Sequence, residues 1–421
     1  MKNKVLTGLL LVLIGGWGSL SAQSAGSNYS RQVNTLIGTK GVGLTSGYLY
    51  PGATYPYGMV QFTPSYFSKR SGFVINQLSG GGCEHMGNFP TFPVKGKLKM
   101  SPDNILNYRI NISEEKGHAG YYEAMVQEDI KAKLTVTERT GMASYEYPTD
   151  QQYGTVIIGG GISATPIEQA AIVITAPNKC EGYAEGGNFC GLRTPYKVYF
   201  VAEFDTDALE SGTWKRNELK PNTTFAEGEY SGVYFTFDVN KKKNIQYKIG
   251  VSYVSVENAR ENLKAENTGW DFLQIQNQAE SKWNHYLGKI EVEGTNPDRT
   301  TQFYTHLYRS FIHPNVCSDV NGEYMGADFK VHKSRSKHYT SFSNWDTYRT
   351  QIQLLSILDP EVASDIVISH QLFAEEAGGA FPRWVMANIE TGVMQGDPTP
   401  ILISNCLLYT SDAADDRISV D

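Results

Sequence analysis

The stretch IQYKIGVSYVS, residues 245–255, alternates apolar and polar side chains from Ile245 to Tyr253. The apolar residues from Tyr247 to Tyr253 fall on one face, and this period of two is typical of a β-strand with one face buried. KAKLTVTE, residues 131–138, repeats the pattern. Similar runs, separated by Gly, Asn and Pro, fill residues 28–256 without a strong helical interruption. They predict an antiparallel β-sandwich as the N-terminal domain.

The period of the pattern changes just after this strand. Apolar residues between Phe272 and Leu287 recur every three or four positions, which predicts an amphipathic helix. Asn296 is a suitable cap and Pro297 a suitable first residue for the next helix. NWDTYRTQIQLLSILDP, residues 344–360, predicts one continuous helix that stops at its proline. We therefore expect a helical linker over residues 257–295, followed by a helical domain over residues 296–405.

The N-terminal residues 1–22 have the three parts of a signal peptide. Two lysines precede an apolar run from Val5 to Ile14, and small residues follow it. The run is too short to span a membrane, and no cysteine stands at the cleavage point to take a lipid. These features predict an exported protein, periplasmic or extracellular, with no membrane span.

Composition narrows the classes of partner. The 421 residues carry a net charge of −7, which argues against nucleic acid. Tyrosine is frequent, at 26 residues. Its ring stacks on sugars and its hydroxyl forms hydrogen bonds, but tyrosine also simply favours β-strands.

Cysteines offer one candidate disulfide. Cys180 and Cys190 flank the glycine-rich stretch CEGYAEGGNFC, and export permits a disulfide that closes it as a loop. Zinc binding is the weaker interpretation, because neither a CxxC motif nor paired histidines accompany them.

Two glycine-rich and proline-rich clusters lie in the predicted sandwich. They are YPGATYPYGMVQFTP, residues 50–64, and SGGGCEHMGNFPTFPVKG, residues 79–96. The three glycines of the second bring the backbone close to another group, and Glu84 and His85 add polar side chains. Each cluster, taken alone, also fits a tight structural loop. The second is not a phosphate-binding loop, because no Lys-Ser or Lys-Thr follows the glycines.

The third cluster lies in the helical domain and joins SFSNWDTYRT, residues 341–350, to FPRWVMANIETGVMQGDP, residues 381–398. Trp345 beside Asp346 is a pair suited to sugars, because the indole packs on the ring and the carboxylate accepts from hydroxyl groups. Asp346 equally fits a residue at a helix N-terminus, with Trp345 in the core. Asp397 fits a turn. Together these residues favour a polar cleft.

The five clusters YPGATYPYGMVQFTP, LSGGGCEHMGNFP, LYRSFIHPN, SFSNWDTYRT and GGAFPRWVMANIETGVMQGDP resemble glycoside hydrolase family 92 from residue 28 to residue 405. The resemblance implies a calcium-dependent, inverting exo-α-mannosidase that removes terminal mannose, with α-1,2 linkages expected, from N-glycans or mannans. It also implies a fold with an N-terminal β-sandwich, a helical linker and an (α/α)6 barrel. Only the first helices of that barrel are expected in this chain.

By motif, the resemblance places Trp345 and Asp346 at the terminal mannose, and extends less directly to four further substrate-binding candidates: Glu84, His85, Arg383 and Asp397. The family's catalytic acid, its base and most of its Ca²⁺ ligands belong to motifs that do not occur here. We therefore expect no catalytic and no metal-binding residue in this chain, and an inactive fragment.

Two alternatives stay open. One is a non-catalytic carbohydrate-binding sandwich protein. The other is a different glycosidase whose two acids are Glu390 and Asp397, which requires these carboxyl groups to face one cleft roughly 5–10 Å apart.

The C-terminal stretch CLLYTSDAADDRISVD, residues 406–421, lacks the Gly, Pro and aromatic density of the motifs before it. It resembles the translation of a sequencing adapter, and we expect it to carry no selected structure. A divergent polar C-terminus is the alternative.

Overall fold

The computed structural model describes most of the chain between residues 28 and 410. The described residues are 28–40, 47–65, 72–105, 108, 111–187, 189–190 and 194–410. The predicted signal peptide, residues 1–22, and residues 411–421 of the C-terminal stretch lie outside them.

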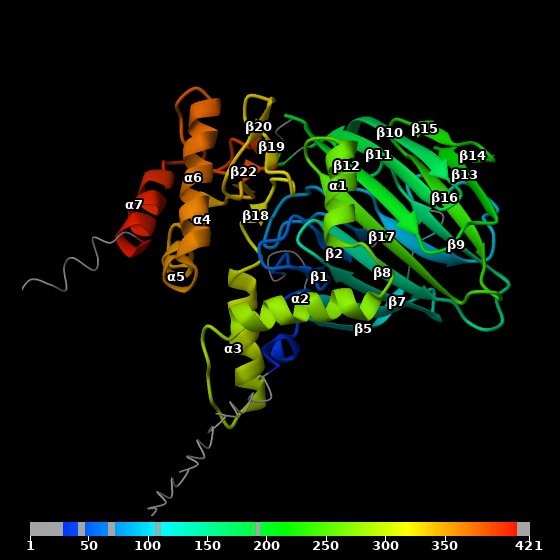
Figure 1. Cartoon of the computed structure of the whole chain (residues 1–421), viewed down its shortest axis with the longest axis horizontal. Coiled ribbons are helices and arrows are strands. Elements are labelled where there is room, and N and C mark those ends of the chain that lie inside the picture. Colours follow the sequence, from blue (N-terminus) through cyan, green and yellow to red (C-terminus); the bar gives the residue numbers. More distant parts are fainter. Residues whose placement is uncertain are drawn as a thin grey trace, which may run out of the picture.

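Two large antiparallel sheets pack on each other and form the N-terminal β-sandwich (Figure 1). The first sheet has the strand order β1 (Ala53–Thr54), β2 (Gln61–Pro64), β3 (Phe73–Val74), β4 (Thr91–Lys95), β9 (Tyr153–Ile158), β16 (Ser231–Asp238), β13 (Glu210–Lys215) and β14 (Glu218–Pro221). The second has the order β15 (Phe225–Glu227), β10 (Ile167–Ala176), β11 (Lys179–Gly186), β12 (Tyr196–Phe204), β17 (Asn244–Ser252), β8 (Thr140–Glu146), β7 (Ile130–Val136), β6 (Tyr121–Val126) and β5 (Ile112–His118). The predicted sandwich is confirmed.

Strand β17 contains residues 245–252 of the alternating stretch and lies inside the second sheet. Its apolar face is buried in the core between the sheets, as the period of two predicted. Its other face is covered as well, because α1 (Val256–Glu266) packs across it. Gly250 permits this contact: a Cβ there would lie 2.5 Å from the carbonyl oxygen of Ala259.

Two predicted helices follow and are confirmed. Helix α2 (Phe272–Leu287) buries its apolar stripe, and α3 (Pro297–Ser310) begins at Asn296. The Asn296 side chain accepts hydrogen bonds from two backbone N–H groups of the first turn, which helix caps normally do. The N-terminal 3-10 helix η1 (Tyr29–Gln32) packs against both helices.

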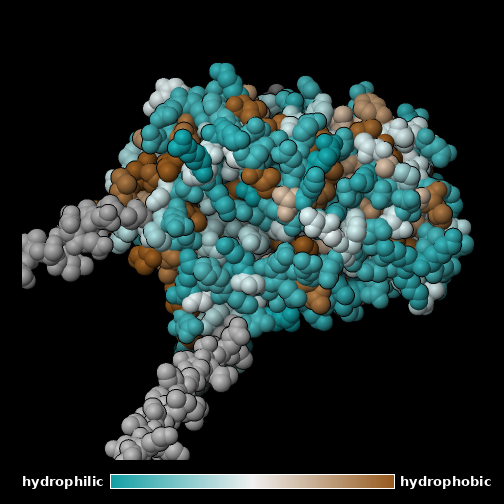
Figure 2. Space-filling view, viewed as in Figure 1, coloured by the Kyte–Doolittle hydropathy of each residue, from teal (hydrophilic) through white to brown (hydrophobic). Residues whose placement is uncertain are grey.

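The C-terminal part consists of short hairpins and four helices beside the sandwich (Figure 1). The hairpin strands are β18 (Asn315–Val316) with β21 (Tyr339–Thr340), β19 (Glu323–Met325) with β20 (Val331–Lys333), and β22 (Val385–Met386) with β23 (Ile389–Glu390). The helices are α4 (Asn344–Thr347), α5 (Gln351–Leu358), α6 (Pro360–Glu376) and α7 (Thr399–Thr410). Hydrophobic side chains are exposed toward the α7 end, at the left of Figure 2. Within the described part, no helix combines the length and apolarity that a membrane span needs.

The single helix predicted over residues 344–360 is wrong, because the structure has two helices there. Thr350 adopts a φ of +63°, in the left-handed region that disfavours residues with a side chain, and it separates α4 from α5. The break lets the Gln351 side chain donate to the carbonyl oxygens of Ser310 and His313. A long-range contact therefore overrides the local helical pattern.

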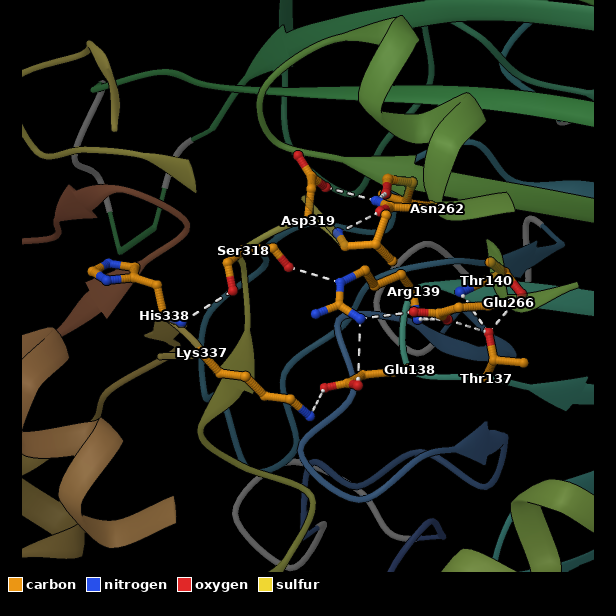
Figure 3. Close-up of polar contacts among 12 residues, drawn as sticks. Thr137, Glu138, Arg139, Thr140, Asn262, Glu266, Ser318, Asp319, Lys337 and His338 are labelled. Atoms are coloured by element: carbon orange, nitrogen blue, oxygen red, sulfur yellow. Dashed lines mark hydrogen bonds and ion pairs between the residues drawn. The ribbon is translucent and has the colours of Figure 1, made fainter. Parts of the chain in front are cut away.

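A buried arginine joins the sandwich to the helical part (Figure 3). Arg139, in the turn between β7 and β8, donates to the Glu266 carboxylate at the end of α1 and to the carbonyl oxygen of Ser318. The next residue, Asp319, accepts from Asn258 and Asn262 of α1. These contacts fix how the helical part sits against the sandwich, and thereby shape the space between them.

Candidate functional site

A cleft of about 560 Å³ lies between loops of the sandwich and the helical part. The sandwich contributes the segment Leu78–Cys83 and the pair Phe189 and Cys190. The helical part contributes Arg309, His313, Ser341, Ser343, Asp346, Thr347, Gln351, Trp384, Val393 and Met394. A more open groove of about 640 Å³ follows the outer face of α2, where the lining is mainly that helix's polar surface. We place the candidate site in the cleft, because loops from both parts converge there.

The sandwich wall of the cleft is the triple glycine, Gly80–Gly82. Below it lies His85, which is fully buried. Its Nε2 accepts from the Leu78 N–H (2.8 Å), so Nδ1 carries the proton and donates to the Cys83 carbonyl oxygen (2.7 Å). Burial lowers the pKa of His85 to about 4, which agrees with the neutral ring that these two contacts require.

His85 therefore holds the loop from beneath and presents neither ring nitrogen to a ligand. A Cβ on Gly81 would lie 2.7 Å from the ring, so the glycine is needed for this packing. Glu84, the other predicted contact in this loop, is exposed and does not line the cleft. His85 thus has a structural role in this loop, and a role for Glu84 in binding stays a prediction.

The disulfide predicted between Cys180 and Cys190 is wrong, because Cys190 pairs with Cys83. The stretch read as a loop is strand β11, and the residue steps from Cys180 to Gly186 span roughly 20 Å of extended chain. Cys180 points into the core and is free. The Cys83–Cys190 bond, with Cα atoms 5.4 Å apart, instead ties the triple-glycine loop to the segment that carries Phe189.

The helical wall carries Asp346, the one carboxylate among the described residues that line the cleft. It lies in the first turn of α4, where its backbone N–H donates to the carbonyl oxygen of Ser343 and its carboxylate accepts from the Ser343 hydroxyl. Arg349, three residues further along, donates to the Tyr348 hydroxyl. Asp346 is exposed, so its carboxylate can accept from a ligand hydroxyl.

Trp345, Arg383 and Asp397 do not line the cleft. The Trp345 ring is 48% exposed on α4, so it is not the core residue of the structural alternative. Arg383 is half-buried, and its guanidinium donates to the carbonyl oxygen of Met394, which positions that residue at the rim. Asp397 is exposed in the loop before α7.

Glu390 has a structural role. Its carboxylate accepts from the N–H groups of Arg383, Trp384 and Gly392, which holds the β22–β23 hairpin. It does not line the cleft, and neither does Asp397. The structure therefore gives no support to a glycosidase built on these two acids.

An aromatic pair in the cleft escaped the sequence reasoning. Trp384 stacks on Phe189, with ring centroids 4.4 Å apart, and both residues line the cleft. They come from the two opposite parts of the molecule. Trp384 stands inside one of the quoted motifs, but no local pattern could show which aromatic residue it would meet.

No metal-binding cluster is evident in the described ranges: nowhere do three or more His, Cys, Asp or Glu side chains come together as a metal ion would require.

Two adjoining parts of the chain match two domain models of one protein family. Residues 32–252 match the glycosyl hydrolase family 92 N-terminal domain, and residues 258–416 match the glycosyl hydrolase family 92 catalytic domain. The first match ends with β17 and the second begins in the first turn of α1, and residues from both matches line the cleft.

Individual relatives are longer than this chain. An uncharacterized secreted glycosidase from Arthroderma benhamiae is 26% identical over 367 residues, covering 76% of this chain and 45% of its own length. A family GH92 α-mannosidase structure from Bacteroides thetaiotaomicron is 25% identical, covers 88% of this chain and 53% of its own, and has a TM-score of 0.79. A family GH92 inverting mannosidase structure from the same bacterium is 25% identical, covers 92% of this chain and 54% of its own, and has a TM-score of 0.81. The chain spans about half the length of these relatives.

Proposed function

Because this chain belongs to glycosyl hydrolase family 92, we propose that its cleft forms part of the terminal-mannose site of an exported, inverting exo-α-mannosidase. The observation that carries the proposal is the position of Asp346. Together with the triple-glycine loop it lines a cleft to which both matched domains contribute. The solved relatives are described as α-mannosidase and inverting mannosidase, which supports mannose as the sugar.

The cleft has the chemistry that a hexose needs. Its volume of about 560 Å³ lies within the range of small-molecule sites. The Asp346 carboxylate accepts from sugar hydroxyls, and backbone groups of the glycine loop approach closely because no side chain intervenes. Trp384 and Phe189 supply an apolar surface for C–H groups. We propose that these residues bind and orient the non-reducing mannose, and that Trp345 extends the site outside the cleft.

Inversion needs two carboxyl groups about 6.5–9.5 Å apart, one as acid and one as base. Asp346 has no carboxylate opposite it among the described cleft residues, so we assign neither role to this chain. The family resemblance also implies Ca²⁺, which takes about six to eight oxygen ligands. The described residues do not fit such a site by themselves, and we derive no step through the ion. Linkage preference for α-1,2 bonds in N-glycans or mannans is part of the proposal.

Titration of the chain with methyl α-mannoside tests the proposal, with methyl α-glucoside, its C2 epimer, as the matched control ligand. We expect saturable binding of the mannoside, followed by NMR, and a loss of at least tenfold in the variant Asp346→Asn. Equal binding of both sugars, or undiminished binding by the variant, would contradict the assignment. Because neither the acid nor the base is assigned to this chain, we expect it to release no mannose from α-1,2-mannobiose, and release would contradict that part of the proposal.

A further inference from the structure

His313 of the helical part reaches across to the triple-glycine loop of the sandwich. It follows α3, lines the cleft, and its Nε2 accepts a hydrogen bond from the Ser79 N–H at 2.8 Å. The preceding residue, Leu78, donates in the same way to His85. Two consecutive backbone amides of one loop are therefore held by two imidazole rings, and only the His313 contact crosses between the two parts.

The protonation of His313 follows from its neighbours. Asn315 donates from Nδ2 to the carbonyl oxygens of Gly58 (2.8 Å) and Ile312 (2.9 Å), which fixes the orientation of its amide. Its Oδ1 must then accept from Nδ1–H of His313 at 2.7 Å. Nε2 is consequently unprotonated, as the Ser79 contact requires. A chain of hydrogen bonds thus runs from Gly58 through Asn315 and His313 to Ser79 in the glycine loop.

We propose that His313 is a positioning residue, which sets the distance between the triple-glycine wall and Asp346 and thereby shapes the sugar site. This inference rests on the proposed function for the identity of the ligand only. Further attachments of the loop are His85, the Cys83–Cys190 bond and the Gly80 N–H, which donates to the Tyr48 carbonyl oxygen at 2.9 Å, and these partners all belong to the N-terminal domain. Among these attachments only His313 bonds the loop directly to the helical wall, whereas the disulfide reaches that wall indirectly, through the stacking of Phe189 on Trp384.

Among the described residues, His85 and Arg309 are the charged or titratable groups that act on the pKa of His313. Burial is the largest effect and lowers the pKa of His313 to about 4; the hydrogen bond with Asn315 opposes it, and His85 and Arg309 add to the lowering. A proton on Nε2 would point toward the Ser79 N–H and break the contact. The hydrogen bond between the Ser79 N–H and His313, which we call the clamp, is therefore expected to persist near neutral pH and to break in acid.

Two variants that differ by one methylene group test the inference in the full chain. In His313→Gln the side-chain oxygen can reach the position of Nε2 and accept from Ser79, whereas in His313→Asn it is too short. We expect amide exchange at Ser79 to rise roughly tenfold in His313→Asn and to stay near wild type in His313→Gln. His306→Asn, on the exposed side of α3, is the control for substitution in this segment. Unchanged exchange at Ser79 in His313→Asn would overturn the inference.

Ligand binding gives the second readout. The affinity for methyl α-mannoside is expected to fall about tenfold in His313→Asn and to stay near wild type in His313→Gln. Above pH 4, the affinity of His313→Gln should also no longer depend on acid, because glutamine does not titrate. Faster exchange in His313→Asn with unchanged mannoside affinity would refute the positioning role, although the clamp itself exists. Absence of mannoside binding by the wild-type chain would refute the proposed function, while the exchange data still decide the clamp.

Discussion

The Cys83–Cys190 bond should be a major source of stability, and its removal tests the pairing directly. It closes a loop with a sequence separation of 107 residues, which spans much of both sheets. In the chain-entropy treatment, closure of such a loop in the unfolded state is worth about 4.8 kcal/mol at 25 °C. The pairing predicted from sequence, Cys180 with Cys190, would close only about ten residues and contribute about 2.7 kcal/mol.

The perturbation is the double variant Cys83→Ala/Cys190→Ala, compared with the wild-type chain with and without reductant. The free energy of unfolding is measured in urea. We expect the double variant and the reduced wild type to lose about 3–5 kcal/mol, with the entropic value of about 4.8 kcal/mol near the upper end of this range. The double variant should show no further response to reductant.

Cys180→Ala is the matched control. Cys180 is fully buried and free, so its truncation leaves only a small cavity, for which a loss of about 1 kcal/mol is typical. The response to reductant should survive in this variant. If it disappears in Cys180→Ala and persists in Cys83→Ala, the reasoning from the structure is refuted and the sequence pairing is restored.

Three further predictions concern the cleft, the joint and acid stability. A Cβ on Gly82 meets nothing within 4 Å, so Gly82→Leu should change the free energy of unfolding by less than about 0.5 kcal/mol. The same variant should weaken mannoside binding, because Gly82 lines the cleft. Unchanged binding would mean that the sugar binds elsewhere. Arg139→Met leaves Glu266 without its buried partner and should lower the free energy of unfolding in urea by about 3 kcal/mol. Arg299→Met, at an exposed arginine, is the control and should lower it less. Equal losses would show that the Arg139 contacts do not stabilise the packing of the sandwich on the helical part. Burial lowers the pKa of His370 to about 4, as it does for His85, so the unfolded chain binds more protons than the folded chain below about pH 6.5. The free energy of unfolding should therefore fall as the pH is lowered from 6.5 to 5. An unchanged value over this range would show that these rings are not neutral in the folded chain.

The sequence was informative wherever one element's own pattern decided the outcome. The alternation around Tyr247 identified a strand, and Asn296 with Pro297 identified a helix start, because burial of one face and capping are local requirements. The same local reasoning failed at Thr350. There the helix breaks so that Gln351 can bind carbonyl groups of residues about 40 positions away, at separations of 41 and 38.

The site shows a second limit of local reasoning. Glu84, His85 and the glycines were singled out together because they are adjacent, but adjacency says nothing of which side chain faces the cleft. His85 turns inward because the backbone N–H of Leu78 needs an acceptor once it is buried. The residue that completes the loop, His313, lies 234 positions from the Ser79 amide that it accepts from. Only the fold brings them together.

The three features that define the cleft share this non-local origin. The disulfide joins residues 107 positions apart, Phe189 meets Trp384 across the two parts of the molecule, and His313 meets Ser79. Each is a contact between a sandwich loop and a distant segment, where no hydrophobic period constrains the sequence. A site between two domains is thus specified by pairs of residues whose types are ordinary taken singly. Variants that alter one member of such a pair, with the length-matched partner variant as control, are therefore the most direct test of how this cleft is built.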